Sequence, residues 1–302
     1  MAQHRPGDPA RQPHHRLRLK RGHRMTTTID GRAVAARVRA QVAAEVAASP
    51  RIPGLATVLV GDDPASAVYV AAKRRAVREA GMRDLHRSLP AHATQAEVTT
   101  VLDDLAADPA VSGILLQLPL PPGLDAAPLL DRIPVGKDVD GLTAASAGRL
   151  ARGEDGLRPC TPSGVLELLD AEGVKLRGAH AVVVGRSALV GRPMADMLLQ
   201  RDATVTLAHR HTADLAAVTR TADVLVVAAG VRGLVGAGHV RHGATVIDVG
   251  IHRTPGGLAG DVRTAELDGI AARVTPVPGG VGPMTIAMLM ANTVRAARWR
   301  RS

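Results

Sequence analysis

The sequence predicts an α/β protein of two domains, the second of which is a doubly wound parallel sheet. A chain of 302 residues is long enough for two domains. From residue 29 onward, short apolar runs alternate with stretches of helical periodicity, which is typical of parallel strands covered by helices. Turn residues crowd the region 119–162 and interrupt this alternation, so we place a domain boundary near residue 158.

Six apolar runs of four to seven residues are predicted strands. Each run is nearly continuous in small aliphatic residues and ends in a Gly, a Pro or a polar residue. Such runs are typical of strands that are buried on both faces of a sheet. They occupy residues 55–61, 113–119, 180–185, 203–209, 224–230 and 244–250.

Amphipathic stretches between these strands predict helices. The helix over residues 64–80 has clear signals at both ends, with Asp62 or Asp63 as its cap, Pro64 in its first turn and Gly81 after its last residue. The other predicted helices cover residues 32–48, 94–107, 162–172, 191–201 and 283–299.

Residues 1–24 differ from the rest of the chain in charge and composition. They hold seven Lys or Arg and one Asp, a net charge of +6 out of the +10 of the whole chain. They are nearly free of apolar residues and lack the apolar stretch of a secretory signal, so we expect a disordered basic extension. Because the remaining residues carry only +4, the charge is weak evidence for a nucleic-acid partner. A nucleic-acid-binding tail is the alternative interpretation of this segment.

The rest of the composition limits the compartment and the chemistry. Cys160 is the only cysteine, so no internal disulfide can form, which fits the reducing cytoplasm. We expect Cys160 to be a small buried residue, with a nucleophile as the alternative. No apolar run approaches the roughly 18 residues that cross a bilayer, and we expect no membrane partner. The histidines show no ligand spacing beyond His209 and His211, so we expect no metal.

Residues 181–199 predict a strand, a tight turn and a helix. In this arrangement, backbone N–H groups and a helix N-terminus hold a pyrophosphate. The usual G-x-G-x-x-G motif is absent, since Gly185 is followed by Ser187, Val190 and a second glycine at 191. Glycines in such a turn can also serve its geometry alone, so this segment by itself leaves nucleotide binding open.

The next predicted strand ends in a group of cations. About 24 residues beyond Gly185, the chain has His209, Arg210 and His211 and no carboxylate, and Arg186 lies in the first turn. An acid at this place binds the ribose 2′-hydroxyl of NAD, whereas an arginine suits the 2′-phosphate of NADP. The pattern therefore favours NADP, with a solvated basic loop as the alternative.

The predicted helix over residues 64–80 carries the only tyrosine of the chain, Tyr69, and one of its four lysines, Lys73. The two lie about 40° apart around the helix, on the stripe of small apolar residues, and the arginines of this helix lie opposite. A lysine among apolar groups has its charged form disfavoured and can exchange a proton, which an arginine cannot do. The alternative is that Lys73 extends over the edge of the core and Tyr69 only packs.

Seven segments of the chain are informative when they are taken together. They are YVAAKRRA (69–76), GILLQLPLP (113–121), KDVDG (137–141), PCTPSG (159–164), GRSALVGRP (185–193), VIDVGI (246–251) and TPVPGGVGPMT (275–285). Each is modest alone, but the seven together resemble the bifunctional methylenetetrahydrofolate dehydrogenase/methenyltetrahydrofolate cyclohydrolase family, because they occur in the family's order and the resemblance covers essentially all of residues 29–298. Residues 1–24 and the near-absence of aromatic residues depart from the family's pattern.

The resemblance implies roles for individual residues. It makes Lys73 the catalytic lysine, with Tyr69 beside it over the pterin ring and Gln117 as its polar partner. It makes Asp140 the acid that binds the pterin, and Asp138 is interpreted as a structural or capping acid. It places Gly280 and Thr285 near the nicotinamide and the substrate, and NADP on Gly185, Arg186, Ser187, Arg210 and the backbone around Ile251.

The resemblance also implies the domain organisation. The last helix returns to the first domain, which gives a catalytic, folate-binding domain of residues 25–158 plus 283–302. A Rossmann-type NADP-binding domain covers residues 159–282, and the active-site cleft lies between the two.

The implied activity is oxidation of 5,10-methylene-tetrahydrofolate by NADP to the 5,10-methenyl form, followed by hydrolysis to 10-formyl-tetrahydrofolate. The implied partners are these tetrahydrofolate derivatives and a second copy in a homodimer. The implied setting is cytoplasmic one-carbon metabolism, including purine biosynthesis. The alternative is a nicotinamide-dependent dehydrogenase of another small substrate that lacks hydrolase activity.

Overall fold

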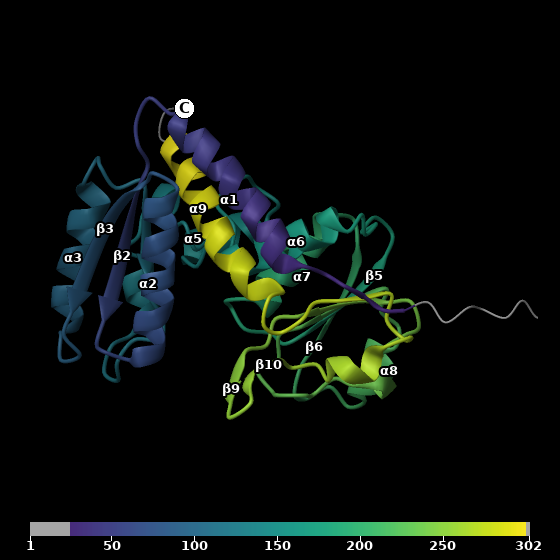
Figure 1. The fold of residues 1–302 in the computed structure, drawn as a ribbon. Helices are drawn as coiled ribbons and strands as arrows, with labels where there is room; N and C mark the ends of the chain where they lie inside the picture. Colours follow the sequence, from purple (N-terminus) through teal and green to yellow (C-terminus); the bar gives the residue numbers. More distant parts are fainter. Residues whose placement is uncertain (1–24, 300–302) are drawn as a thin grey trace, which may run out of the picture.

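The computed structural model describes residues 25–299, so the expected extension 1–24 and residues 300–302 lie outside the described part of the chain. Two parallel sheets with helices on their faces form the two halves of the molecule (Figure 1). The long helices α1 (Gly31–Ala47) and α9 (Val281–Trp299) lie side by side between these halves (Figure 1).

The first half is a three-stranded parallel sheet with the strand order β3-β2-β4. Its central strand is buried at every residue, as its continuous apolar sequence predicts. Helices α3 and α4 cover one face, and α2 covers the other together with α1 and α9. Its elements are β2 (Gly54–Val60), α2 (Pro64–Glu79), β3 (Arg83–Leu89), α3 (Gln95–Ala107), β4 (Gly113–Leu116), α4 (Ala126–Leu130) and the 3₁₀ turn Val135–Lys137.

The second half is a six-stranded parallel sheet with the order β1-β11-β8-β7-β5-β6. The chain runs from β5 outward to β6 and then returns to β7 on the other side of β5. The strand order therefore reverses at the carboxyl ends of β5 and β7, which is where doubly wound sheets bind ligands. The strands are β1 (Thr27–Thr28), β5 (His180–Val184), β6 (Thr204–Ala208), β7 (Val224–Val227), β8 (Thr245–Asp248) and β11 (Arg273–Val274).

Helices cover both faces of this second sheet, and a small hairpin projects from it (Figure 1). The hairpin consists of the antiparallel strands β9 (His252–Thr254) and β10 (Gly257–Ala259). The helices are α5 (Ala144–Ala151), α6 (Cys160–Ala171), α7 (Gly191–Leu199) and α8 (Leu215–Thr219), with 3₁₀ turns at Ala237–His239 and Thr264–Leu267.

All six predicted strands and all six predicted helices are present, most of them a residue or more shorter than the sequence pattern indicated. The sequence pattern missed β3, whose residues RDLHRSL form no apolar run. The reason is its position, because β3 is an edge strand with half-exposed and exposed residues. The two-residue β1 pairs with β11, so the first described residues join the second sheet. The domain boundaries themselves stay a prediction.

Helix α9 packs against both halves. Met284 and Ala287, near its start, belong to the core that includes α6 and β5. Leu289 and Val294, further along, belong to the core that includes α2 and β2. The helix therefore connects the two cores beside the cleft. Within residues 25–299, no helix is both long enough and apolar enough to cross a membrane.

Candidate active site

Helix α2 begins at a strong N-terminal signal. Pro64 is its first residue, and Asp63 caps it, because the Oδ2 atom of Asp63 accepts a hydrogen bond of 2.7 Å from the backbone N–H of Ser66. This backbone hydrogen bond is the main reason why the pKa of Asp63 lies below its ordinary value. The cap fixes the start of the helix and hence the direction of every side chain along it.

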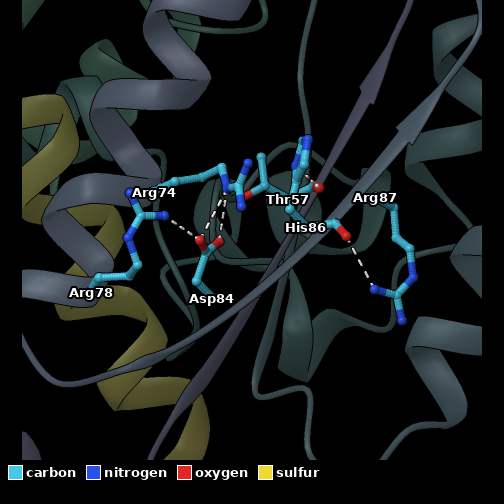
Figure 2. A network of polar contacts seen from close by, with 6 residues as sticks. All are labelled: Thr57, Arg74, Arg78, Asp84, His86 and Arg87. Carbon is cyan, nitrogen blue, oxygen red and sulfur yellow. Dashed lines mark hydrogen bonds and ion pairs between the residues drawn. The ribbon is translucent and has the colours of Figure 1, made fainter.

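Carboxylates pair with the arginines of α2, and Figure 2 shows the two arginines that pair with Asp84. Asp84 on β3 accepts hydrogen bonds from Arg74 Nε at 3.0 and 3.1 Å and from Arg78 Nη1 at 2.5 Å (Figure 2). Arg75 pairs more loosely with Glu79, one turn further along, at 3.9 Å. The predicted arginine face is confirmed, and the two pairs with Asp84 hold α2 against the edge strand.

Lys73 lies on the other side of α2, in a cavity of about 190 Å³. Its Nζ atom donates a hydrogen bond of 3.0 Å to Gln117 Oε1. The Nε2 atom of Gln117 donates a hydrogen bond of 2.5 Å to the carbonyl oxygen of Leu118. This bond orients the side-chain amide of Gln117 so that its oxygen faces Lys73. Strand β4 ends at Leu116, so Gln117 lies directly after the carboxyl end of this strand. Four of the predicted residues line this cavity, namely Lys73, Gln117, Asp140 and Thr285.

Asp140 is half-buried beside Cys160 in the same cavity. Burial raises the pKa of the Asp140 carboxyl group, while the charge of Lys73 and a hydrogen bond from the Cys160 thiol oppose this change. Burial and the charge of Asp140 raise the pKa of the Cys160 thiol well above its ordinary value. The thiol therefore stays protonated, and it also lies 3.2 Å from the carbonyl oxygen of Val139, to which it can donate. Cys160 is buried, as expected.

The KDVDG segment positions Asp140 through its neighbours. Asp138 is buried and accepts hydrogen bonds from the backbone N–H groups of Leu142 at 3.2 Å and Thr143 at 2.9 Å, which confirms its structural role. Lys137 is also buried, and its Nζ atom donates to three carbonyl oxygens at the C-terminal end of α3, at 2.7 to 3.1 Å. These contacts fix the loop, so the carboxylate of Asp140 faces the cavity.

The sequence analysis did not assign two residues of this cavity to the site. Thr161 lies in the first turn of α6, and its Oγ1 atom is 3.0 Å from that of the predicted Thr285. Cys160 precedes it and contacts Asp140 as described above. Both belong to the PCTPSG segment, so its place in the resemblance was the signal that could have found them.

A second cavity, of about 390 Å³, lies on the neighbouring turns of α2 and α9. Tyr69 lines it and is 42% exposed, and the predicted Ile251 and Gly280 lie in its wall. Tyr69 and Lys73, which the sequence places one turn apart, thus line two adjacent cavities. The hydrogen bond that Lys73 makes is to Gln117, and Tyr69 lies in the neighbouring part of the cleft.

Asp248 ends strand β8 in the wall of this second cavity. Its carboxylate accepts hydrogen bonds from the backbone N–H groups of Gly250, Asp261 and Val262 at 2.9 to 3.0 Å. Burial nevertheless raises the pKa of Asp248 to about 6. Asp248 therefore connects the segment directly after β8 with the segment around Asp261 and Val262, and its oxygens are occupied by these backbone hydrogen bonds.

A third cavity, of about 590 Å³, lies at the point where the strand order of the second sheet reverses. A Cβ atom at Gly185 would come within 2.0 Å of the carbonyl oxygen of Ala228, and one at Gly191 within 2.0 Å of that of Gly185. Only glycine fits this close packing, which leaves the backbone of the turn open to a ligand. Arg186 and Arg210 line the cavity together with His209, and its described lining residues include no acid. The shape and charge fit an anionic dinucleotide.

Two further residues complete the description of this turn. The Oγ atom of the predicted Ser187 accepts hydrogen bonds from the backbone N–H groups of Val190 at 3.2 Å and Gly191 at 3.4 Å, just before and at the start of α7. Arg186 also lines a shallow cavity with Arg192 on α7. The sequence analysis did not single out Arg192, although it lies in the GRSALVGRP segment.

The fold and these three cavities define a two-domain, dinucleotide-binding α/β enzyme with a lysine, an amide and a carboxyl group in its cleft. Two family models match the chain. The tetrahydrofolate dehydrogenase/cyclohydrolase catalytic domain matches residues 29–140, and the NAD(P)-binding domain of the same name matches residues 159–301. The chain belongs to the tetrahydrofolate dehydrogenase/cyclohydrolase family, as the seven segments predicted.

Known proteins are similar over nearly the whole chain. The bifunctional protein FolD 2 of Frankia alni is 67% identical over 274 residues, which are 89% of this chain and 95% of that protein. The crystal structure of the bifunctional FolD enzyme of Campylobacter jejuni matches with a TM-score of 0.89 at 43% identity, covering 91% of this chain and 99% of that one. The FolD enzyme of Trypanosoma brucei, complexed with NADP cofactor and inhibitor, matches with a TM-score of 0.87 at 39% identity, covering 92% and 99%.

Proposed function

We propose that the cleft converts 5,10-methylene-tetrahydrofolate to 10-formyl-tetrahydrofolate in two steps, with Lys73, Gln117 and Asp140 acting on the substrate. The chain is a bifunctional, NADP-dependent methylenetetrahydrofolate dehydrogenase and methenyltetrahydrofolate cyclohydrolase. The observation that carries the assignment of residues is the 3.0 Å hydrogen bond between Lys73 and Gln117, in a cavity that also holds Asp140.

Oxidation is the first step and needs mainly positioning. A lone pair on the adjacent ring nitrogen expels hydride from the methylene carbon, and NADP supplies the acceptor for that hydride when it is bound. Asp140 holds the pterin ring by hydrogen bonds, and Tyr69 presents a flat face to the same ring. Gly280 and Thr285 complete the wall around the reacting carbon. Orienting the substrate in this way lowers the barrier without acid–base catalysis.

Hydrolysis is the second step and needs proton transfer. The oxygen of a water molecule bonds to the methenyl carbon, and the bond from that carbon to the pterin nitrogen then breaks. One proton of the water ends on this nitrogen, and the other is released. The Nζ atom of Lys73 moves protons between the water and the nitrogen, and Gln117 orients the amine. An arginine at this place could not exchange the proton.

The dinucleotide cavity holds NADP through its turn and its cations. Gly185 lets the backbone approach the pyrophosphate, and Ser187 adds a hydroxyl at the start of α7. Arg186 and Arg210 contact the 2′-phosphate, for which the lining of cations without an acid is the supporting observation. The backbone around Ile251, in the wall that also contains Gly280, supports the nicotinamide end.

One assay tests the whole proposal. Purified protein is incubated with 5,10-methylene-tetrahydrofolate and either NADP or NAD, and both the reduced cofactor and the methenyl intermediate are followed by absorbance. We expect faster reduction of NADP than of NAD and little accumulation of the methenyl form. Reduction with full accumulation of the methenyl form would contradict the hydrolase step, and no reduction would favour a dehydrogenase of another substrate.

We also propose a homodimer that works in cytoplasmic one-carbon metabolism and supplies purine biosynthesis. The family resemblance supports these points, and β3 offers an exposed sheet edge that a second copy could cover. Size-exclusion chromatography with light scattering measures the oligomeric state. A monomer at micromolar concentration would contradict the dimer.

A further inference from the structure

Asp261 is a fully buried acid that has no part in the two reaction steps described above. It lies shortly after the hairpin of β9 and β10. Its Oδ2 atom accepts hydrogen bonds from the backbone N–H groups of Ala229 at 2.7 Å and Gly230 at 2.8 Å. Its Oδ1 atom lies 2.7 Å from the Nε2 atom of His252. Because an aspartate carboxylate accepts hydrogen bonds, this ring nitrogen of His252 is the donor.

The two backbone N–H groups belong to the loop after β7, which forms part of the dinucleotide cavity. Ala229 lines this cavity, and the carbonyl oxygen of Ala228 packs closely against Gly185 in the turn after β5. Gly230 has a positive φ of 67°, a conformation that glycine adopts without strain. Asp261 is not among the described residues that line the cavity, so it holds this loop from behind.

Asp261 is also connected to the segment after β8. The backbone N–H groups of Asp261 and Gly250 both donate to the Oδ1 atom of Asp248, at 3.0 and 2.9 Å. A Cβ atom at Gly250 would come within 2.4 Å of Asp261 Oδ1, so the two segments are in close contact. Ile251 follows Gly250 and lines the second cavity, where the nicotinamide end is proposed to lie. One buried acid thus contacts the loops at both proposed ends of NADP.

We propose that Asp261 and His252 are positioning residues for NADP. Asp261 fixes the spacing between the loop after β7 and the segment after β8, and His252 holds the carboxylate in the orientation that connects them. Without this carboxylate, the N–H groups of Ala229 and Gly230 lose their acceptor and turn toward water, which shifts the wall of the dinucleotide cavity. This inference rests on the proposed function, because it uses the proposed place of the nicotinamide end beside Ile251.

The test measures the binding of NADP separately from catalysis. The dissociation constant of NADP is determined by isothermal titration calorimetry on the full chain, without folate. The variants are Asp261→Ala, His252→Ala and the conservative His252→Gln, whose amide nitrogen can still donate to the carboxylate. Cyclohydrolase activity without cofactor is the second readout, because neither Asp261 nor His252 is among the described residues that line the cavity of Lys73.

His180→Ala is the matched control. His180 is half-buried in the same sheet, and its ring nitrogens lie 2.9 Å from Thr206 Oγ1 and 3.2 Å from the carbonyl oxygen of Thr221. Its removal therefore also costs the domain side-chain hydrogen bonds. However, His180 begins β5, at the opposite end of this strand from Gly185 and the dinucleotide cavity. This variant should lower the Tm and leave the binding of NADP unchanged.

We expect His252→Ala to raise the dissociation constant of NADP about tenfold, the effect of one lost hydrogen bond to a charged group. Asp261→Ala should raise it further, because two backbone N–H groups then lose their acceptor. His252→Gln should retain most of the affinity, and His252→Ala should retain the cyclohydrolase activity. An equal loss of NADP affinity in His252→Ala and His180→Ala would overturn the proposal, because only the stability of the domain would then matter.

The two proposals fail in different ways. If wild-type protein catalyses both reactions and His252→Ala binds NADP as tightly as wild type, the positioning role is wrong and the proposed function stands. If wild-type protein binds NADP but does not oxidise 5,10-methylene-tetrahydrofolate, the proposed function is wrong. The titrations of the variants with NADP then still decide whether Asp261 and His252 support the bound cofactor.

Discussion

Replacement of Lys73 separates proton transfer from charge. Lys73→Met keeps the length of the side chain and removes the amine. Lys73→Arg keeps a positive charge near Asp140 and Gln117 but cannot release its proton. The two variants together therefore distinguish a lysine that moves protons from one that only supplies charge.

The contacts of Lys73 indicate how much each variant should lose in each of the two reactions. General acid–base catalysis contributes about 10²–10⁴ in rate, or about 3–5 kcal/mol of the barrier. Both variants should lose this factor in the cyclohydrolase step. Lys73→Met also removes the hydrogen bond to Gln117 and the charge that holds down the pKa of Asp140, so that pKa should rise further. The dehydrogenase step should fall by no more than about tenfold, the effect of one lost hydrogen bond in positioning the substrate.

The two steps are assayed separately in each variant. Cyclohydrolase activity is the loss of methenyl-tetrahydrofolate absorbance without cofactor, and dehydrogenase activity is the reduction of NADP. Arg75→Met is the matched control, because Arg75 lies on the same helix and faces away from the cleft, toward Glu79. A Lys73→Arg variant with nearly normal cyclohydrolase activity would refute proton transfer and leave an electrostatic role. A normal rate in Lys73→Met would refute both roles.

Three other predictions concern the cofactor and the stability of the fold. Arg210→Ala should lower the ratio of kcat/KM for NADP to that for NAD by about 10–100-fold, the effect of a charged hydrogen bond; an unchanged ratio would place the 2′-phosphate elsewhere. Asp138→Asn should lower the free energy of unfolding in urea by about 1–3 kcal/mol, because an amide cannot accept from both backbone N–H groups, and an unchanged midpoint would contradict this. Because burial raises the pKa of Asp248 from 3.8 to about 6, the folded state holds this proton more tightly than the unfolded chain. The tighter binding of this proton therefore adds about 3 kcal/mol to the free energy of unfolding below about pH 4. This contribution is lost as the pH rises through 6. The difference in unfolding free energy between wild type and Asp248→Asn should therefore fall between pH 4.5 and 7.5, and a constant difference would contradict the raised pKa.

The sequence predicted those parts of the site that depend on local periodicity. The direction of Lys73 followed from the helical wheel, and the ion pairs of Asp84 explain why the arginines stay on the other face. The turn at Gly185 followed from the order of strand, glycine and helix. In each case, the residues that decide the geometry lie within one element or in two consecutive elements, so a pattern in the chain is enough to find them.

Contacts between distant segments were not accessible in this way. Gln117 lies 44 residues from Lys73, and only the resemblance connected the two before their hydrogen bond was seen. Thr161 is 124 residues from Thr285, and neither residue type indicates a partner. The edge strand β3 was missed because half-exposed edges need no apolar run. Tertiary packing determines these features. A single sequence shows no periodic pattern from which such contacts between distant segments could be predicted.

The scarcity of lysine is itself informative in this chain. Lysine occurs four times against 34 arginines, so a composition that favours arginine has retained lysine at few places. Lys137 is buried and donates to three carbonyl oxygens at the end of α3, which matches the three N–H groups of a compact ammonium and not a flat guanidinium. Lys73 lies in the cleft against Gln117, where only an amine can give up a proton. Lys175 is exposed, so not every lysine of the chain lies at a position of this kind. In a chain so rich in arginine, a lysine inside the fold therefore marks a position where the shape or the proton chemistry of the ammonium group is required.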